Sequence, residues 1–318
     1  MRIAKFYSGV IPLISILLVL AITASAFMLR RPVVVVTEPE FNMVYGTFRS
    51  IIKQAELSIK YFRRITQIPV TISAGPEIVA AAVDSVSSSP YIVFLPGFFA
   101  SAANKYLETK PDIPVFILAG RSRAAAVNKQ DGPPYYVYTD TQTDLYSAGV
   151  CAAYLAGENN GAGTGIMLVQ DEILSSALRQ IFEDGLRAGG FIGAPRYLEN
   201  NSDFSIGQTC SCAVIIGSPA RFFELNPKLP VILFSWLDPD MTPSNVRIIF
   251  DDSLWAAADE VLQVWKDDPT EILGGNPGNQ NTFVPSHLTV PWGRGSEGEV
   301  FYGKISAKKT VPVIVPVN

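Results

Sequence analysis

Short apolar runs rich in Val, Ile and Phe alternate with longer stretches of helical periodicity from residue 32 onward. Runs of this kind, bounded by polar, Gly or Pro turn residues, are typical of buried parallel strands joined by crossover helices. In the first half of the chain the predicted strands are Val33–Val36, Ile68–Ser73, Tyr91–Leu95, Pro114–Leu118 and Tyr135–Thr139.

The stretches between these strands predict the helices Phe41–Phe62, Glu77–Ser87 and Ala100–Thr109. The last of them ends before Lys110-Pro111, because a residue that precedes proline disfavours the α region. Each of the first three strands is thus followed by a helix, as in a βαβ series.

A second series follows a predicted helix over Thr143–Leu155 and a Gly-rich turn, Gly157–Gly165. Its elements are the strands Ile166–Val169, Pro195–Leu198, Ala213–Ile216, Val231–Phe234 and Val246–Phe250, and the helices Ile173–Ala188 and Leu254–Lys266. After Pro269 the chain is rich in Gly, Pro and Asn. There the pattern predicts irregular structure and a hairpin-like pair, Val300–Ile305 with Thr310–Val315.

Two similar series in tandem predict an α/β protein with two Rossmann-like lobes and a ligand cleft between them. The helix Leu254–Lys266 follows the second series, and we expect it to return to the first lobe. The expected lobes are therefore discontinuous. Lobe 1 comprises residues 32–140 plus about 252–285, and lobe 2 comprises residues 141–251 plus about 286–318.

Residues 1–31 form a separate N-terminal segment. Arg2 and Lys5 precede an apolar run, Val10–Leu29, that contains the small residues Ala24-Ser25-Ala26. This order is typical of a secretory signal peptide. An apolar run of about 20 residues can also span a bilayer, so a retained membrane anchor remains the alternative. Both readings predict an exported protein, either periplasmic or at the outer face of the cytoplasmic membrane.

Composition and charge exclude several classes of protein. The chain is 48% hydrophobic and 17% charged, which excludes a disordered chain, and its net charge of −4 offers no basic footprint for nucleic acid. The odd number of cysteines, Cys151, Cys210 and Cys212, and the close spacing of the last two argue against a disulfide framework. Neither a Cys-x-x-Cys motif nor a His cluster suggests a metal site, so the three are expected to be core residues.

No catalytic motif is found in the sequence. The only histidine is His287, and no Gly-x-Gly-x-x-Gly or Gly-x-x-x-x-Gly-Lys-Ser/Thr loop follows a predicted strand. A mechanism based on a Ser-His-Asp or Cys-His arrangement would depend on that one histidine. We therefore expect a binding protein without catalytic residues, metal or cofactor rather than an enzyme.

Aromatic and polar residues follow several predicted strands. Open α/β sheets bind ligands at the carboxyl ends of their strands, so these residues are the candidate ligand contacts. They are Glu38, Phe41, Asn42, Phe98, Phe99, Gln170, Asp171, Trp236 and Asp238. Aromatic faces stack on flat or apolar ligand surfaces, and carboxylates and carboxamides bind hydroxyl or amine groups, so the set suits a nucleoside or a sugar.

Other interpretations of these residues stay open on the sequence alone. Phe98-Phe99 fits a core position equally well, and Glu38 fits the first turn of a helix, where a carboxylate complements the macrodipole. Asp238 fits a turn before Pro239.

Three short segments resemble the basic membrane protein family, the purine-nucleoside receptor type of ABC-transporter substrate-binding protein. The first is Glu38–Asn42, with Val44–Gly46 after it. The second is Gly97–Ala103, followed by Lys110–Ile117, and the third is Tyr146–Ala153. The resemblance runs from about Val33 to Lys266 and implies the type I periplasmic binding protein fold.

The resemblance also implies roles for individual residues. Phe41 and one Phe of Phe98-Phe99 would sandwich a base, Glu38 and Asn42 would bind its edge, and Asp238 would accept from ribose hydroxyls. The implied partners are a small-molecule ligand and the membrane permease of an ABC transporter, and the expected state is a monomer.

The chain also departs from the family pattern. No lipobox Cys is present, Glu38 stands where Asp is usual, and Trp236 replaces a smaller residue. A sugar ligand in the same fold, or a membrane-anchored sensory protein without a transporter, are the alternative functions.

Overall fold

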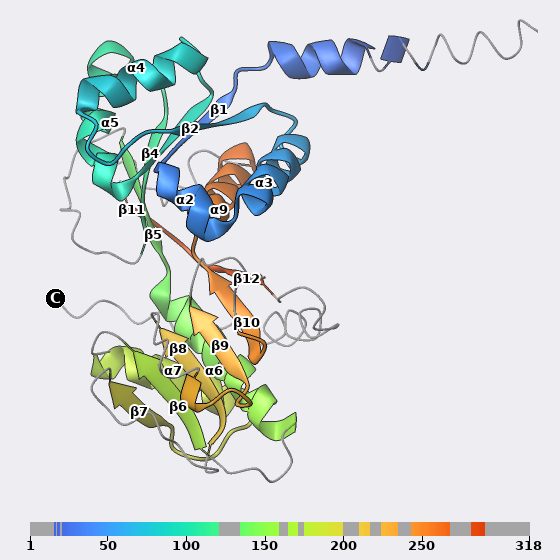
Figure 1. Cartoon of the computed structure of the whole chain (residues 1–318), viewed down its shortest axis with the longest axis vertical. Coiled ribbons are helices and arrows are strands. Elements are labelled where there is room, and N and C mark those ends of the chain that lie inside the picture. The colour runs from blue at the N-terminus through green and yellow to red at the C-terminus, as the bar shows by residue number, and fades with distance from the viewer. Residues whose placement is uncertain are drawn as a thin grey trace, which may run out of the picture.

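The computed structural model describes residues 16, 18, 19, 21–120, 134–158, 165–170, 175–199, 210–216, 224–234, 243–267 and 281–289. The described strands form two six-stranded sheets, one in each lobe of Figure 1. We call the upper part the first lobe and the lower part the second lobe. Among the described residues no helix is both long and apolar enough to cross a bilayer.

The sheet of the first lobe has the order β11-β5-β4-β3-β1-β2, with all neighbours parallel. Every residue of β1 is buried, because helices cover both faces of the sheet. The strands are β1 (Val33–Thr37), β2 (Ile65–Pro69), β3 (Ile92–Pro96), β4 (Val115–Gly120), β5 (Tyr135–Thr139) and β11 (Asn281–Val284).

Two layers of helices enclose this sheet. One core cluster joins Val33 and Val35 to Leu57 of α3 and Trp255 of α9. The opposite face packs against α4 and α5. The helices, in addition to α2 (Pro39–Tyr45), are α3 (Thr47–Lys60), α4 (Pro76–Val86), α5 (Ala100–Thr109) and α9 (Leu254–Asp267).

The sheet of the second lobe has the order β12-β10-β9-β8-β6-β7. Among its described strands only β12 runs antiparallel, with His287 opposite Asp251 of β10. The strands are β6 (Gly165–Gln170), β7 (Arg196–Glu199), β8 (Cys210–Ile216), β9 (Val231–Phe234), β10 (Val246–Asp251) and β12 (His287–Thr289). One face carries α6 (Thr141–Glu158) and α7 (Ser176–Ala188).

Two glycines allow α6 and α7 to pack with their backbones in close contact. A Cβ atom on Gly149 of α6 would lie 2.8 Å from the backbone nitrogen of Leu186, and one on Gly185 of α7 would lie 2.9 Å from the carbonyl carbon of Tyr146. Each glycine thus faces the backbone of the other helix, where no larger residue fits. Because α6 directly follows β5, this contact also positions the first element of the second lobe.

The chain passes between the lobes at the ends of three strands. β5 of the first sheet leads into α6 of the second lobe, and β10 of the second sheet leads into α9, which packs on the first sheet. β11 belongs to the first sheet and β12 to the second, with Pro285-Ser286 between them. Because β5 and β10 both cross from their carboxyl ends, the carboxyl edges of the two sheets face each other (Figure 1).

The α/β class with two Rossmann-like sheets is confirmed, but some element boundaries differ from the sequence prediction. The predicted helix Phe41–Phe62 is two helices, because Gly46 between them has φ 96°, a left-handed conformation that glycine adopts without steric cost. β2 lies three residues before the predicted Ile68–Ser73.

Near the C-terminus the structure also differs from the sequence prediction, whereas the prediction for the cysteines is confirmed. β11 and β12 occupy a region predicted to be irregular, and the pair Val300–Ile305 with Thr310–Val315 lies outside the described residues. Cys151, Cys210 and Cys212 are buried, so their prediction as core residues is confirmed.

Candidate functional site

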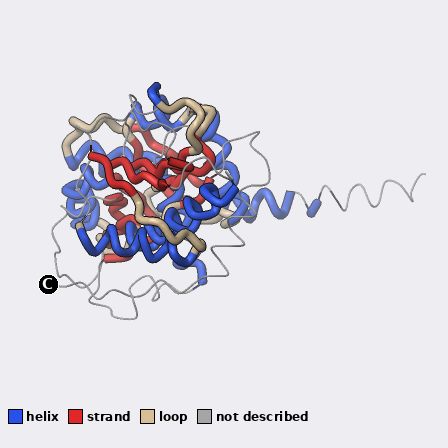
Figure 2. Tube along the Cα trace, turned by 90° about the horizontal axis from the view of Figure 1, so that it is seen from below, coloured by secondary structure: helices blue, strands red, loops and turns tan. Residues whose placement is uncertain are grey.

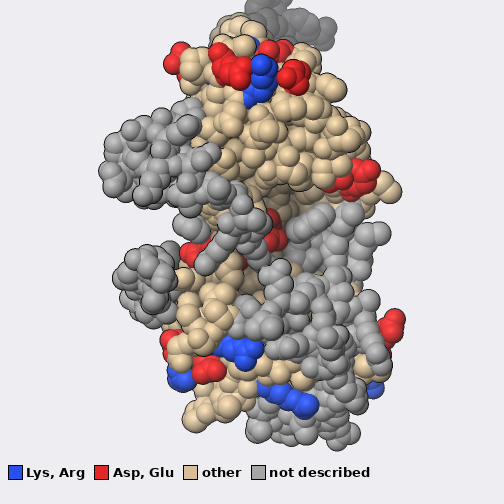
Figure 3. Space-filling view, turned by 90° about the vertical axis from the view of Figure 1, so that its left-hand side faces the viewer, with Lys and Arg blue, Asp and Glu red and all other residues tan. Residues whose placement is uncertain are grey.

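The two lobes enclose a hollow at the carboxyl edges of the sheets. Figure 3 shows the surface recessed between the lobes, with acidic side chains visible in the recess. Ligands of open α/β sheets bind at such an edge, so the described residues that follow the strands decide what this site can hold.

Asn42 of α2 takes part in a network of side-chain hydrogen bonds among amides and hydroxyls. The Gln67 amide nitrogen donates to the Asn42 carboxamide oxygen and to the Thr37 hydroxyl, each at 2.9 Å. Ser50 in turn donates to the Gln67 oxygen at 3.1 Å and accepts from the Trp255 indole nitrogen at 2.9 Å. Because the Asn42 oxygen already accepts from Gln67, Asn42 is oriented to serve a ligand as a hydrogen-bond donor.

Phe41 of the same helix lies in an aromatic stack. Its ring stacks on Tyr45 with centroids 5.1 Å apart and an angle of 13° between the ring planes. The Arg49 guanidinium lies over the Tyr45 ring, 4.1 Å from its centroid. Burial, with the nearby Asp251 carboxylate, raises the pKa of Tyr45, so the phenol stays neutral. One face of the half-buried Phe41 is thus occupied by Tyr45.

Glu38 is the residue that precedes α2, and its backbone is extended there. Its pKa is raised, first by burial and then by the Glu40 carboxylate, so the two carboxylates lie close together. Pro39 occupies the start of α2, where its missing N–H costs no hydrogen bond. The Glu38 side chain is half-buried just after the carboxyl end of β1, where it can accept hydrogen bonds.

The two phenylalanines after β3 have different environments. Phe98 is 48% exposed, whereas Phe99 is 3% exposed and packs in the core against α4 and α5. Both lie in a single 3-10 turn, Gly97–Phe99, in which successive side chains are about 120° apart, and their rings make an edge contact with centroids 4.7 Å apart. The structure therefore assigns Phe99 to the core, in correction of its place among the candidate contacts, and leaves Phe98 as the ring that a ligand can reach.

The second-lobe candidates are only partly described. Gln170 is the last residue of β6, at the carboxyl edge, while Asp171, Trp236 and Asp238 lie outside the described residues. Their place at a ligand stays a prediction. Of the first-lobe set, Glu38 directly precedes α2 and Phe41 and Asn42 lie within it, after β1. Phe98 follows β3, and β1 and β3 are neighbours in the sheet.

Polar residues at the lobe crossings were not identified from the sequence. Asp144 of α6 is 1% exposed, and its two carboxylate oxygens accept from the Ser286 backbone nitrogen at 2.8 Å and the Ser286 hydroxyl at 2.6 Å. The contact joins the β5–α6 crossing to the β11–β12 crossing. No local signal reveals it, because the partners lie 142 residues apart.

Asp251 forms a second contact of this kind. Its Oδ2 lies 2.8 Å from Nη2 of Arg49 on α3, and its Oδ1 accepts from the Ser253 backbone nitrogen at 2.9 Å. The side chain of Asp251 is 4% exposed and that of Arg49 is 15% exposed. The pair therefore fixes the β10–α9 crossing to a helix of the first lobe in a largely water-excluded place.

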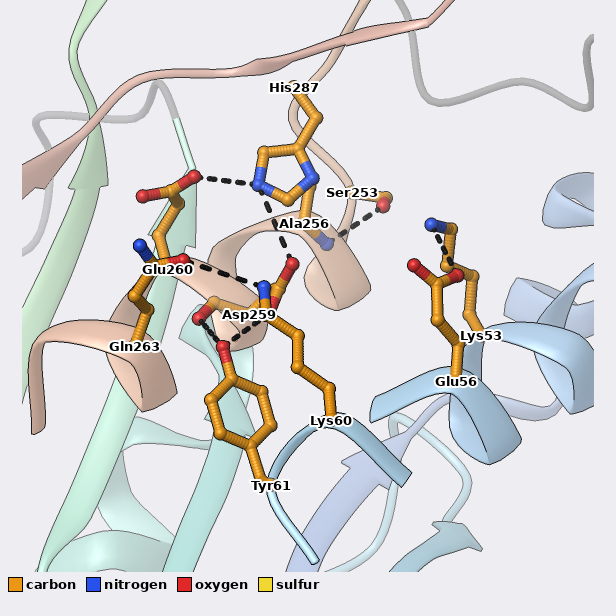
Figure 4. Close-up of polar contacts among 10 residues, drawn as sticks. All are labelled: Lys53, Glu56, Lys60, Tyr61, Ser253, Ala256, Asp259, Glu260, Gln263 and His287. Carbon is orange, nitrogen blue, oxygen red and sulfur yellow. Dashed lines mark hydrogen bonds and ion pairs between the residues drawn. The ribbon is translucent and has the colours of Figure 1, made fainter. Parts of the chain in front are cut away.

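His287 is the third polar contact between the lobes (Figure 4). Its Nε2 on β12 lies 2.7 Å from Oε1 of Glu260 on α9 and 4.0 Å from Oδ2 of Asp259. Asp259 also accepts from Lys60 at 2.7 Å and from the Tyr61 hydroxyl. In the described part of the chain no group of three His, Cys, Asp or Glu side chains is placed to hold a metal ion.

The charge of His287 should make stability depend on pH. Burial lowers its pKa, but Glu260, Asp259 and Asp251 outweigh burial and raise the pKa above the ordinary 6.5. A folded-state pKa above the unfolded value means that the contribution is fully present below about pH 6.5 and is lost as pH rises through the folded-state value. The free energy of unfolding, measured with denaturant, should be lower for His287→Gln than for the parent, with the largest difference near pH 6 and the smallest near pH 9.

A matched control for this test is Glu108→Gln, which removes an exposed ion pair on α5. The free energy of unfolding of this variant should differ little from that of the parent, and the difference should be nearly constant over the same pH range. A His287→Gln difference that stays constant or grows with rising pH would refute the assigned contact.

Comparisons with known proteins support the fold at low sequence identity. Neither a protein-family model nor a curated protein matches the sequence. A solute-binding protein of an ABC transporter system from Conexibacter woesei superposes with a TM-score of 0.54 at 11% identity, over 90% of this chain and 98% of that chain. A transcriptional activator of the comK gene from Bacillus halodurans has a TM-score of 0.50 at 12% identity, over 89% and 98%.

A third similar structure is a LacI-family repressor from Corynebacterium glutamicum, with a TM-score of 0.41 at 12% identity, over 83% of this chain and 98% of that chain. The Conexibacter woesei and Bacillus halodurans structures are similar in fold to the present chain. On the described residues and these superpositions, the chain has the two-lobed α/β fold of the type I periplasmic binding proteins.

Proposed function

We propose that the chain is an extracytoplasmic solute-binding protein of an ABC-type transporter, without catalytic activity. The observation that supports this function is the pair of mostly parallel sheets whose carboxyl edges face each other across the recess. The Phe98 ring is exposed after β3, at the carboxyl edge of the first sheet. The similar solute-binding protein from Conexibacter woesei, nearly all of which is covered, supports the same role.

The proposed ligand is a nucleoside or a related small polar molecule. Phe98, together with Phe41, would stack on its flat part, while Glu38 and Asn42 would bind its polar edge. Asp238 is proposed to accept from ribose hydroxyls. A sugar would use the same aromatic faces, so the ligand panel in any test must contain both classes.

Binding is proposed to close the lobes about the crossings. A hinge of this kind consists of a few residues at the ends of elements, which fits the β5–α6, β10–α9 and β11–β12 junctions. Contacts that a ligand makes with both lobes exist only in the closed state, and their free energy is what shifts the population toward closure.

The proposed partners and location follow from the same role. The permease of an ABC transporter would receive the ligand, and the protein would act outside the cytoplasm. Export is expected from the order of Arg2, Lys5 and the apolar run Val10–Leu29.

Loss of the Phe98 ring should weaken ligand binding. We expect Phe98→Ala to cost about 1–3 kcal/mol for a nucleoside, the range found for stacking of a base on an aromatic ring. The measurement is calorimetric titration with the solute that stabilises the parent most in a panel of nucleosides, bases, sugars and amino acids. Phe98 is half-exposed, so its removal leaves the core intact.

The matched control is Phe48→Ala, because Phe48 is also an exposed phenylalanine of the first lobe but lies on α3 and does not directly follow a strand. It should leave the affinity unchanged. Equal affinities of the parent and Phe98→Ala would remove Phe98 from the site, and equal losses in both variants would show a general effect on the first lobe.

A further inference from the structure

The exposed side of α3 carries an apolar stripe. Phe48, Ile51, Ile52 and Ile59 are 75%, 57%, 46% and 79% exposed, and their spacing places them on one face of the helix. The opposite face contributes the buried Ser50 and Leu57 to the first lobe. We call these four residues the α3 stripe. A contiguous apolar face of this kind marks an interaction site more often than free surface.

Five cations gather where α3 ends. Lys60 is the last residue of the helix, and the Arg63 guanidinium donates to the Arg31 carbonyl at 3.3 Å, so the N-terminal side of β1 meets the end of α3. Burial, and then the charges of Arg30 and Arg31 among other groups, lower the pKa of Arg63, which shows how close these cations lie. We call the set the basic collar: Arg30, Arg31, Lys60, Arg63 and Arg64.

Among the described residues of α3, little acidic charge opposes the basic collar. Lys60 is paired with Asp259, and Glu56 is the one acidic residue in the α3 sequence and pairs with Lys53. A local surplus of cations in a chain of net charge −4 indicates a partner surface that is anionic.

A second apolar element lies beside the basic collar. Residues 21–29 are helical, and the rings of Phe27 and Phe62 make an edge contact with centroids 5.6 Å apart. Ile22, Met28 and Leu29 of this helix are exposed. In Figure 1 the helix leaves the first lobe on the side where α3 lies, so the α3 stripe, the basic collar and this helix belong to one side of the molecule. Figure 2 shows the same helix projecting away from the body.

We propose that this side of the first lobe binds the surface of an anionic lipid bilayer, with the α3 stripe in the interface and the basic collar at the headgroups. An apolar helical face bordered by Lys and Arg is the pattern of helices that lie in a membrane interface. Arginines and lysines at such a surface are attracted by anionic lipid. The proposal goes beyond solute binding, since it concerns the outer surface of the lobe and not the recess.

A second copy of the chain fits the same side less well. It would bring an identical basic collar and the same α3 sequence, in which Glu56 is the one acid and is already paired. The charge would therefore stay uncompensated in a symmetric pair, whereas anionic lipid neutralises it.

The test uses the full chain with a polarity-sensitive fluorophore on Ile52→Cys or Ile59→Cys. The native cysteines Cys151, Cys210 and Cys212 are buried, so the label goes to the introduced thiol. The matched control is Ile78→Cys, because Ile78 is 61% exposed but lies on α4, which packs on the opposite face of the first sheet. Each protein is mixed with vesicles of phosphatidylglycerol and phosphatidylcholine that contain a lipid-borne quencher.

The expected result is quenching at positions 52 and 59 that is several-fold larger than at position 78. It should fall in vesicles of phosphatidylcholine alone and in high salt, because salt screens the attraction between the basic collar and the lipid. Equal quenching at all three positions would overturn the proposal. So would efficient cross-linking of two copies through position 52 in the presence of vesicles, because the stripe would then pair two chains.

Solute titration of the same labelled proteins keeps this test separate from the proposed function. The labels lie outside the recess, so solute affinity should match that of the parent whether or not lipid binds. Loss of lipid contact with intact solute binding would thus overturn the membrane proposal alone.

Discussion

Gly185→Ala should destabilise the protein by about 1–3 kcal/mol, because the new methyl group would meet the backbone of α6. The Cβ atom would lie 2.9 Å from the carbonyl carbon of Tyr146 and 3.1 Å from its Cα, and it would approach the carbonyl oxygen still more closely. Backbone atoms cannot change rotamer to make room, so α6 and α7 must separate along the face that covers the second sheet. Urea unfolding followed by circular dichroism measures the change.

Gly157→Ala is the matched control for this substitution. Gly157 lies in α6 as well, but a Cβ atom there would meet no heavy atom within 4 Å. Alanine adopts the helical conformation without strain and lowers the conformational entropy of the unfolded chain relative to glycine. This variant should therefore be more stable than the parent by about 0.4–1 kcal/mol. A Gly185→Ala variant as stable as the parent would show that the two helices do not pack as closely as described.

Asp251→Ala should destabilise the protein by about 3–5 kcal/mol, the cost of leaving a buried partner charge uncompensated. Arg49 would lose the carboxylate that lies 2.8 Å from its guanidinium, and the Ser253 backbone nitrogen would lose its acceptor. Both losses fall at the β10–α9 crossing. We therefore expect a lower free energy of unfolding in chemical denaturation, and a cooperative transition that shifts to lower denaturant.

The control for Asp251→Ala is Asp84→Ala, which removes the partner of Lys110 at the surface. The Asp84 side chain is 44% exposed, so water solvates the remaining charge and the change should be about 0–1 kcal/mol. Similar losses in the two variants would show that the Arg49–Asp251 pair is not the buried contact that fixes the crossing.

The sequence was sufficient to predict the layered architecture, because buried parallel strands produce continuous apolar runs. β1, β5 and β9 lie where the runs of Val, Ile, Tyr and Phe were found. β2 and β12 are less clear in sequence, because β2 has a single fully buried residue, Ile65, and β12 is a short antiparallel strand. Patterns of burial are weak signals at such positions.

Gly46 shows why a helical pattern alone did not locate the end of α2. Apolar residues continue at helical spacing on both sides of it, so one long helix was predicted, and only the backbone conformation of Gly46 reveals the break. A glycine within a helical pattern is compatible with both outcomes.

The candidate site could be predicted in composition but not in geometry. Phe98 and Phe99 are equivalent in sequence, and the 3-10 turn decides which ring reaches the surface. Asp144 and Ser286 are neither aromatic nor part of a motif. They are in contact only because the folded chain brings the β5–α6 crossing next to the β11–β12 crossing. Long-range polar contacts of this kind depend on the folded chain and leave no local pattern.

The measurement that tests the proposed function most directly is the thermal unfolding of the full chain with a panel of nucleosides, bases, sugars and amino acids. A solute that binds only the folded state adds RT ln(1 + [L]/Kd) to its stability, about 2.7 kcal/mol at a 100-fold excess over Kd. We predict that at least one nucleoside or sugar raises the unfolding temperature in proportion to the logarithm of its concentration. A cooperative unfolding transition that no solute of the panel shifts would contradict the role as a solute-binding protein for this class of ligand.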